Sequence, residues 1–527
     1  MRLRKDLLYL QGLIEERKPN RKVIQDYDKN KKENQGFLKS LMDELSSYKR
    51  KTSPLCRHLR LDDILNEAFD YKIKKDNIRK QVIFIKTAKG NFFIKRSFLT
   101  RRKDRLRHFF LPGRRWAEWR NLHKLKALDV ESAQPVIRGK SVNQIPKSFF
   151  IITKEVEGKA LNGDMQPDAV VMAEFFADLH QKGFYYSDLH PANLIIKPNG
   201  RPALIDVQEI FFLKKIPRWL RSYNLGKLYL SLKSKLDPSW FEEFLQTYNA
   251  KFKNDINYYQ VRKASEIHYK KHLKSRTKRC LKNSSEFEVL KGKGQKIFKR
   301  KDFECEEKDI LDAIKNGINL KENKVIAYKN ICIKIHEKGR FHKDRCFDSW
   351  VNSRALHVRG IEVPRALGYF KFKNKSYFIS DYLKGGIPLY KYLPTITEQK
   401  DKRKIIKQLA LWIRKIHHHQ IWQKDFNSTN VLCFNNQFIL LDLDNIKYEN
   451  LAEEKKIYNL GQINASVADT IKIKDRIRFF YYYFHGDLPE RKIRRAIYDK
   501  IWKITLTKNT SVFGLDTSNA NCFNIPE

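Results

Sequence analysis

The chain has 527 residues, 41% of them hydrophobic, which is enough for two or three domains with packed cores and excludes a disordered protein. Its formal net charge of +47 would attract nucleic acid, an anionic membrane surface or an acidic substrate, although solvated lysine-rich faces would give the same total. No apolar run approaches the roughly 18 residues of a membrane-spanning helix, so we expect none.

The cysteines and the first residues predict a cytosolic protein. Seven scattered cysteines without Cys-x-x-Cys spacing fit a reducing compartment and argue against a zinc site. The opening is basic but has no long apolar core and no small-residue cleavage site, so we expect no signal peptide. Leu3, Leu7, Leu10 and Ile14 have helical spacing and predict an amphipathic helix, which either packs on the first domain or lies on an anionic membrane.

The first half of the chain opens with a predicted hairpin. Apolar and polar residues alternate in QVIFIKTAKGNFFIKRSF on both sides of a Lys-Gly-Asn turn. The segments that follow it are a basic helical stretch at 101–128, a strand and turn at 149–161, a helix at 169–181, a loop at 184–196, a short buried strand within 201–210, and helices to about 254.

The same order returns in the second half, from a hairpin at 324–336 onward. Tyr-Asn-Leu-Gly follows in both halves, with Tyr223 35 residues after Asp188 and Tyr458 33 residues after Asp425. We interpret this as duplication of a domain-sized unit. The predicted division is a helical extension at 1–55, a domain at 56–262, a basic linker or solvated helix at 263–282, and a domain at 283–527.

Five polar residues of the first half have the order that phosphoryl transfer from ATP requires. Asp188 and Asn193 are five residues apart in DLHPAN, and Asp206 ends the apolar strand ALID eighteen residues after Asp188. This spacing predicts Asp188 as the catalytic base, with Asn193 and Asp206 as magnesium ligands. Lys95, in FFIK, would hold the phosphates, and Glu118, in WAEWRNL, would pair with Lys95.

The second half has most of the same set. Asp425 and Asn430 are five apart in DFNSTN, Asp442 follows at seventeen in FILLD, and Lys334 lies in ICIK. Matching WVNSRAL to WAEWRNL puts Asn352 at the place of Glu118, and an amide cannot neutralise a lysine. This half could therefore be weaker, borrow another carboxylate, or be a binding or regulatory copy. A single Asp-x-x-x-x-Asn is weak evidence because loop Asp residues are usually caps, but the full order at two places is much more specific.

These motifs resemble those of the lipopolysaccharide kinase family, the Kdo/WaaP group of protein-kinase-like sugar kinases. The similarity rests on AEWRNL, YSDLHPANLII and ALID in one half and on RGIEVP, KDFNSTNVL and LLDLD in the other, over about 75–255 and 285–510. It implies an α+β chain of two tandem protein-kinase-like bilobal domains, each with a small antiparallel-sheet lobe and a mostly helical lobe. It also implies ATP and Mg²⁺ as cofactors, and a heptose or Kdo hydroxyl of the lipopolysaccharide inner core as acceptor.

The phosphate loop and the residues before the catalytic Asp depart from the pattern of this family. Neither half has a Gly-x-Gly-x-x-Gly loop, and Gly292 and Gly294 fit a turn better. The usual His-Arg is replaced by Tyr-Ser before Asp188 and by Gln-Lys before Asp425.

The segment after the metal-binding Asp also departs from protein kinases. No Phe-Gly and no Ala-Pro-Glu follows Asp206 or Asp442, and Tyr223 comes only 17 residues after Asp206. Protein kinases hold their peptide on a longer segment that ends in Ala-Pro-Glu. A small or glycolipid acceptor is therefore favoured over a protein.

Arginines and aromatic residues alternate in the segment that joins Lys95 to the Glu118 helix. Arginine forks suit phosphate and carboxylate oxygens, so we predict that this segment faces an anionic core sugar or lipid. A solvated helix face with its aromatics in the core is the alternative. The segment contains Arg96, Arg101, Arg102, Lys103, Arg105, Arg107, Arg114, Arg115 and Arg120, with Phe98, Phe109, Phe110, Trp116 and Trp119.

The leading hypothesis is an ATP-dependent kinase for a lipopolysaccharide core sugar, peripheral to the cytoplasmic face of the inner membrane and in contact with an anionic glycolipid. A kinase for another small molecule or a protein is the first alternative, and a pseudokinase pair that binds nucleotide or an anionic partner is the second. Nucleic acid is not expected as a partner, because only charge supports it. The run His417-His418-His419 lacks metal-ligand spacing and favours a structural or solvent-facing role.

Overall fold

A computed structural model describes residues 36–100, 116–142, 147–161, 165–253, 255–292, 294–321, 324–337, 343–467, 471–484 and 489–513. The chain forms two compact units, Met1–Tyr269 and Lys270–Glu527. The predicted amphipathic helix with Leu3, Leu7, Leu10 and Ile14 lies outside the described residues, as does 101–115 of the basic segment.

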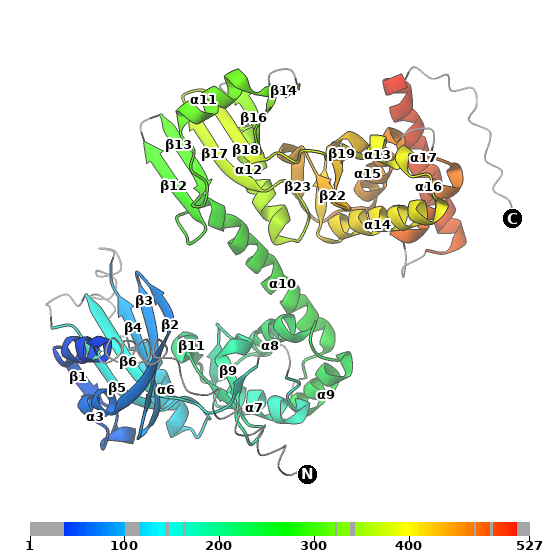
Figure 1. The fold of residues 1–527 in the computed structure, drawn as a ribbon. Helices are drawn as coiled ribbons and strands as arrows, with labels where there is room; N and C mark the ends of the chain where they lie inside the picture. Colours follow the sequence, from blue (N-terminus) through cyan, green and yellow to red (C-terminus); the bar gives the residue numbers. More distant parts are fainter. Residues whose placement is uncertain are drawn as a thin grey trace, which may run out of the picture. The chain divides into compact units, whose positions relative to one another are not determined.

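The first unit begins with an antiparallel sheet in the strand order β1-β5-β6-β4-β3-β2 (Figure 1). A helix over 36–46 precedes it. The elements are β1 (Lys49–Thr52), α3 (Leu61–Asn66), β2 (Ala68–Asn77), β3 (Lys80–Thr87), β4 (Gly90–Phe98), α6 (Ala117–Ala127), β5 (Pro135–Lys140) and β6 (Ser148–Lys154).

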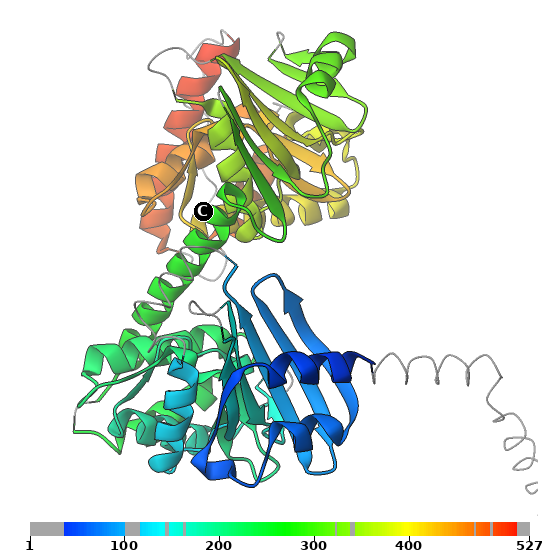
Figure 2. The same ribbon diagram turned by 90° about the vertical axis from the view of Figure 1, so that its left-hand side faces the viewer.

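Strands β3 and β4 have two different faces, as the alternation in their sequence predicts. One face is buried beneath the helix over 36–46, which Figure 2 shows in dark blue against the strands. The core between them contains Ile83, Ile85, Phe92, Ile94, Leu41 and Leu45. Lys95 lies between the buried residues Ile94 and Arg96, so its side chain emerges on the opposite face of the sheet.

The second part of the first unit is mostly helical, with short hairpins between its helices (Figure 1). Its core is built around Phe176, Leu225 and Phe244. The elements are β7 (Lys159–Ala160), α7 (Ala169–Gln181), β8 (Phe184–Tyr186), η2 (Pro191–Asn193), β9 (Leu194–Ile196), β10 (Pro202–Leu204), η3 (Val207–Glu209), β11 (Ile210–Phe212), α8 (Arg218–Leu232), α9 (Pro238–Asn249) and α10 (Tyr258–Thr277).

The second unit also begins with an antiparallel sheet, in the order β12-β13-β17-β18-β16-β15-β14. Apart from β12, this order corresponds strand by strand to that of the first unit. The elements are η4 (Lys278–Leu281), β12 (Phe287–Gly292), β13 (Gln295–Arg300), α11 (Glu307–Asn316), β14 (Ile318–Lys321), β15 (Val325–Tyr328), β16 (Ile331–Glu337), α12 (Arg345–Val358), β17 (Ala366–Phe372) and β18 (Lys375–Asp381).

The helical part of the second unit follows the same plan, with an added helix α13 (Figure 1). Its core surrounds Trp412, Phe426 and Leu460. The elements are β19 (Ile387–Pro388), α13 (Leu389–Thr395), α14 (Gln399–His418), β20 (Ile421–Gln423), η5 (Ser428–Asn430), β21 (Val431–Phe434), β22 (Gln437–Leu440), η6 (Leu443–Asn445), β23 (Ile446–Tyr448), α15 (Glu453–Ser466), α16 (Ile473–Tyr483) and α17 (Arg491–Phe513).

The two sheets share irregularities as well as strand order. The β2–β3 pairing shifts register between Ile73 and Lys75, and β14–β15 shifts between Asn319 and Lys321. The pairings β5–β6 and β17–β18 each contain a further shift. A bulge has to be specified by the local sequence. Its recurrence at matching places is therefore strong evidence that the two sheets correspond strand by strand. The predicted α+β class with antiparallel sheets is confirmed.

The observed units differ from the predicted division at two places. Residues 36–55, assigned to a helical extension, include β1, which pairs with β5 and completes the first sheet. The boundary between the units falls after Tyr269, within α10, and not after 262; residues 263–282 are mainly helical, as one of their two interpretations had it, and Ala264 is buried in the first unit. In the described part of the chain, no helix has both the length and the apolar surface to cross a bilayer.

The repeated Tyr-Asn-Leu-Gly tetrapeptide joins the loop before β9 to a helix behind it. Asn224 Nδ2 donates to Tyr186 O at 2.6 Å, and Asn459 Nδ2 donates to Gln423 O at 2.9 Å. The glycines allow close packing of helices. A Cβ on Gly226 would lie 2.5 Å from Ala264 Cβ on α10, and one on Gly461 would lie 2.5 Å from Ile504 on α17.

A Gly226→Ala substitution should therefore force α8 and α10 apart and destabilise the first unit by about 1–3 kcal/mol. Thermal unfolding followed by circular dichroism would show this as a lower midpoint. Gly36→Ala is the matched control, because a Cβ there would meet nothing within 4 Å. Equal unfolding temperatures for the two variants would contradict the close packing.

A buried histidine supports this tetrapeptide in each unit. His180 Nδ1 lies 2.6 Å from the Tyr248 hydroxyl, and its Nε2 lies 3.1 Å from Asn224 Oδ1. His417 Nδ1 lies 2.6 Å from the Tyr483 hydroxyl. Burial lowers the pKa of His180 to about 4 and that of His417 to about 3. The structural role expected for His417 thus takes the form of a neutral, buried imidazole.

These depressed values predict a loss of stability in acid. Below about pH 6.5 the unfolded chain takes up a proton at each of these histidines, while the folded chain stays neutral down to about pH 4 at His180. The free energy of unfolding should fall by up to about 1.4 kcal/mol per pH unit for each histidine across that window. His180→Gln should be less stable than the wild type at pH 7 and show a shallower acid slope. Tyr248→Phe should lower stability but keep the slope, and an unchanged slope in His180→Gln would contradict the assignment.

Candidate active site

The face of the first sheet that carries Lys95 also receives a carboxylate from α6. Lys95 Nζ forms an ion pair with Glu118 Oε1, and both side chains are largely buried, with 14% and 8% exposed. Burial by itself would lower the pKa of Lys95, but the charges of Glu118 and Asp206 outweigh it and raise the pKa. The predicted pairing of Lys95 with Glu118 is present, and the charge of Asp206 acts on the same lysine.

The β9–β10 hairpin brings Asn193 beside Asp206. Leu194 pairs with Leu204, and one step further the Ile205 N–H donates to Asn193 O at 2.9 Å. Asp206 follows directly with a left-handed backbone, at φ 54° and ψ 54°. A non-glycine residue in this region is uncommon, and such conformations cluster at functional sites.

Tyr186 links these groups. Its hydroxyl donates to Asp206 O at 2.8 Å, and the residue stands two positions before Asp188. Burial raises the pKa of Tyr186, and the charges of Asp206, Asp188 and Glu118 raise it further. Three of the predicted site carboxylates thus lie close enough to raise the pKa of this one buried hydroxyl. Tyr186, which stands where the sequence pattern has its usual His, thus holds the backbone of Asp206.

Asp188 itself is more exposed than the groups around it. Its side chain is 64% accessible, and its Oδ1 accepts from Lys227 Nζ at 3.0 Å. Asn193 Nδ2 donates to Asp188 O at 3.3 Å, which ties the two ends of the DLHPAN loop together. The structure therefore brings together all five residues predicted for the first unit. Lys227, which contacts Asp188, was missed because nothing in its spacing identifies it.

The β2–β3 turn stands where a glycine-rich loop was sought. Asn77 Oδ1 accepts from the backbone N–H groups of Arg79 and Lys80, at 3.0 and 2.8 Å. Those amides are therefore already satisfied within the turn. The turn offers cationic side chains instead, and Lys80 Nζ reaches Asp206 Oδ2 at 3.7 Å.

Lys334 of the second unit has a different set of partners. Its Nζ lies 2.6 Å from Asp442 Oδ1 and 3.2 Å from Asp444 Oδ1, the second aspartate of the LLDLD motif. Burial lowers the pKa of Lys334, but the two carboxylates outweigh this and raise it. Burial would raise the pKa of Asp442, but the charge of Lys334 outweighs burial and lowers this pKa. The pKa of Asp444 is raised, mainly by burial. The second unit thus borrows another carboxylate, one of the alternatives predicted for it.

The alignment that placed Asn352 at the position of Glu118 is wrong by three residues. Asn352 Nδ2 donates to Leu443 O at 2.7 Å, and Asn121 Nδ2 makes the same bond to Val207 O at 2.8 Å. Each acceptor directly follows the left-handed aspartate, Asp206 or Asp442, so Asn352 corresponds to Asn121. The residue at the place of Glu118 is then Ser349, whose buried Oγ has no hydrogen-bond partner.

The rest of the second site repeats the first. Asn430 Nδ2 donates to Asp425 O at 2.9 Å, and Gln423 Nε2 donates to Asp442 O at 3.2 Å, as Tyr186 does in the first unit. Asp442 is also left-handed, at φ 52° and ψ 64°. The backbones of Asp425 and Asp442 are thus held by contacts equivalent to those of Asp188 and Asp206.

One further sequence prediction, for Arg96, turns out differently, and the one for Gly292 and Gly294 is confirmed. Arg96 does not face the site, because it is buried on the opposite face of β4, where it bonds to Gln81 at 2.8 Å and pairs with Glu44. Gly292 and Gly294 lie at the β12–β13 turn, as expected. In the described part of the chain no cluster of three or more His, Cys, Asp or Glu is arranged so that it could hold a metal ion.

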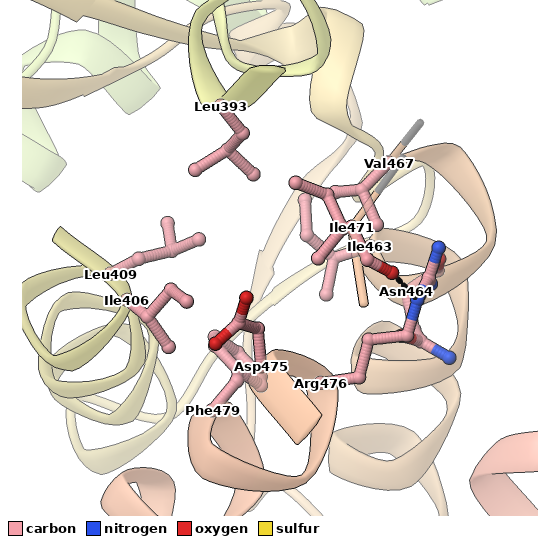
Figure 3. Close-up of a pocket in the computed structure, with 10 residues that line it drawn as sticks. All are labelled: Leu393, Ile406, Leu409, Ile463, Asn464, Val467, Ile471, Asp475, Arg476 and Phe479. Carbon is pink, nitrogen blue, oxygen red and sulfur yellow. Dashed lines mark hydrogen bonds between the residues drawn. The ribbon is translucent and has the colours of Figure 1, made fainter. Parts of the chain in front are cut away.

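A small cavity of about 40 Å³ lies elsewhere, in the helical part of the second unit (Figure 3). Figure 3 shows the Asp475 carboxylate among apolar side chains, and its Oδ1 accepts from Arg478 Nη1 at 2.7 Å. The cavity has room for a water molecule and not for a sugar or nucleotide. None of the site residues lines it.

The role of Asp444 as a carboxylate partner of Lys334 can be tested by removing this carboxylate and placing one on α12. In a chain with Lys95→Met, which removes the corresponding lysine of the first unit, we expect Asp444→Asn to weaken Mg²⁺–ADP binding about tenfold, or about 1.4 kcal/mol. Adding Ser349→Glu should restore most of the affinity, because it supplies a carboxylate from α12 as Glu118 does from α6. Calorimetry would measure both, with Asp302→Asn, a surface ion-pair variant, as control. Unchanged affinity in Asp444→Asn would contradict the role of Asp444.

The chain was compared with known proteins. No curated protein sequence matches it. Among solved structures, an aminoglycoside-3'-phosphotransferase of type VIII matches with 12% identity and a TM-score of 0.30, over 40% of this chain and 98% of the other. The bifunctional kinase-methyltransferase WbdD matches with 14% identity and a TM-score of 0.26, over 36% and 47%. Residues 333–483 match the model of the Lipopolysaccharide kinase (Kdo/WaaP) family, so the resemblance predicted from the motifs is confirmed for that part of the second unit.

Proposed function

We propose that the chain is an ATP-dependent kinase that phosphorylates a sugar hydroxyl, heptose or Kdo, of the lipopolysaccharide inner core. The observation that carries the proposal is the same in both units. A lysine on the central sheet forms an ion pair with a carboxylate, and each site has a left-handed aspartate whose carbonyl is held by the side chain two positions before the Asp-x-x-x-x-Asn loop. In each unit the Asn of that loop donates to the carbonyl of its Asp and closes the loop. The family match over 333–483 supplies the class of acceptor.

The residues present suit magnesium and a nucleotide. Asn193 uses Nδ2 to hold Asp188 O, which leaves its Oδ1 available, and Asp206 contributes a carboxylate that Lys80 approaches only at 3.7 Å. Oxygen donors of this kind, completed by phosphate oxygens and water, are what Mg²⁺ prefers. Bound Mg²⁺ would neutralise charge on the phosphates. Lys95, kept charged by Glu118, suits a phosphate oxygen.

Each residue of the first unit then has a role. Lys95 holds the nucleotide phosphates, Asn193 and Asp206 bind the metal, and Asp188 orients the acceptor hydroxyl and accepts its proton. The 64% exposure of Asp188 suits a base that must meet an incoming sugar. Lys80, on the β2–β3 turn, adds a cation where backbone amides are not free to bind phosphate.

The second unit can bind nucleotide in the same way, through Lys334, Asn430 and Asp442. Lys334 is paired at 2.6 Å with Asp442, the proposed metal ligand, so magnesium and nucleotide have to compete with that ion pair, whereas Asp444, at 3.2 Å, keeps the lysine charged as Glu118 does for Lys95. This favours slower transfer in the second unit, or a binding role, over equal turnover in both.

The excess positive charge suits an acceptor with acidic sugars at an anionic membrane surface. We place the protein at the cytoplasmic face of the inner membrane as a peripheral protein. A field of this sign concentrates anionic ligands near the surface, and salt weakens it.

Asp188→Asn should abolish phosphate transfer from the first unit, by about 10³-fold or more, because it removes the carboxylate that we assign to take the proton of the acceptor hydroxyl. The measurement is incorporation of labelled phosphate from ATP into purified core oligosaccharide, made in a chain that also carries Asp425→Asn. Asp178→Asn, which removes an aspartate paired with Lys182 at 2.8 Å in the same unit, is the matched control and should transfer normally. Transfer that survives in Asp188→Asn would overturn the role of Asp188.

A further inference from the structure

A lysine from the helix behind the catalytic loop contacts the proposed base. Lys227 is the residue after Gly226 on α8, and its Nζ donates to Asp188 Oδ1 at 3.0 Å and to Ser187 O at 2.9 Å. The Lys227 side chain is 23% exposed, against 64% for Asp188. A mostly buried ammonium group thus anchors a carboxylate that is itself open to approach.

The second unit has a glutamine at the same place. Gln462 follows Gly461, and its Nε2 donates to Lys424 O at 3.0 Å, the carbonyl directly before Asp425. Asp425 receives a hydrogen bond from Asn427 at 2.9 Å instead of from a lysine. The two units therefore share the contact from the helix to the loop backbone and differ in the charged contact to the aspartate.

The geometry points to Lys227 as a positioning residue for Asp188, and we infer that it makes the first unit the faster phosphotransferase of the two. This inference rests on the proposed function, because it takes Asp188 as the base. With Oδ1 held by Lys227, Oδ2 is left for the acceptor. Asp188 takes the proton of the acceptor hydroxyl as the hydroxyl oxygen bonds to the transferred phosphorus, while the bond from that phosphorus to the leaving diphosphate oxygen breaks.

The support behind Lys227 is rigid. Asn224, three residues earlier on α8, donates to Tyr186 O at 2.6 Å, and Gly226 packs directly against Ala264 of α10. An exposed carboxylate would otherwise sample several rotamers, and a displacement of about 1 Å can cost about 100-fold in rate. A lysine fixed on a packed helix removes that freedom.

Gln462 of the second unit shows how the charge of Lys227 can be removed while its hydrogen bond to the loop backbone is kept. Lys227→Gln should keep the bond to Ser187 O, as Gln462 does to Lys424 O, and lose the contact to Asp188. Lys227→Arg keeps a cation, and Lys182→Gln is the matched control, since Lys182 is 28% exposed and pairs with Asp178 at 2.8 Å away from the site. All variants are made in the full chain with Asp425→Asn, and the reaction measured is hydrolysis of Mg²⁺–ATP.

Lys227→Gln should lower kcat about 10- to 100-fold with little change in KM for ATP, and Lys227→Arg should recover part of the loss. A kcat equal to that of Lys182→Gln, with turnover lost in Asp188→Asn, would overturn this inference and leave the proposed function intact. Full turnover in Asp188→Asn would overturn both. A rise in KM at constant kcat would assign Lys227 to nucleotide binding and contradict the positioning role, and circular dichroism checks that each variant is folded.

Discussion

Both sites depend on a buried amide that holds one backbone carbonyl. Asn224 and Asn459 each fix the residue two positions before the proposed base, and each is carried by a helix whose glycine packs tightly against the helix behind it. That fixed point sets the start of the Asp-x-x-x-x-Asn loop, and the short hairpin after it sets the position of the left-handed aspartate. Neutral histidines complete this support, because a charged imidazole in the same place would be costly to bury.

The differences between the units are coordinated. Glu118 pairs with Lys95 from a helix, but Ser349 at the corresponding place has no carboxylate, and Asp444 supplies one to Lys334 from the turn after Asp442. The first unit has Gln208 at the place of Asp444. Each unit therefore has one carboxylate at these two positions, on the helix in the first unit and in the turn in the second. The lysine needs a carboxylate beside it to stay charged in a buried place, and two different elements can meet that need.

Local patterns predicted much of this from sequence. Alternation placed Lys95 and Lys334 on strands, and fixed spacing placed Asp188, Asn193 and Asp206 together, because a short hairpin leaves little choice of geometry. The Asn352 alignment failed because the residues around it match by type, while the true equivalence is set by a hydrogen bond 91 positions away in sequence. Arg96 was misread because a strand turns neighbouring residues to opposite faces. Lys227 could not be found at all, since its contact spans 39 positions and follows from helix packing.

The β2–β3 turn has one further consequence. Asn77 occupies the two amides at its tip, so the turn does not require the conformational freedom of glycine. In the first sheet Lys75, Val82 and Lys95 lie opposite one another across three strands, and Lys321, Val325 and Lys334 do so in the second. Two lysines that lie in line across a sheet, with a valine on the strand between them, are written in no contiguous motif. Fingerprints built on glycine spacing therefore pass over such proteins, and cross-strand register is the feature by which related sites could be recognised.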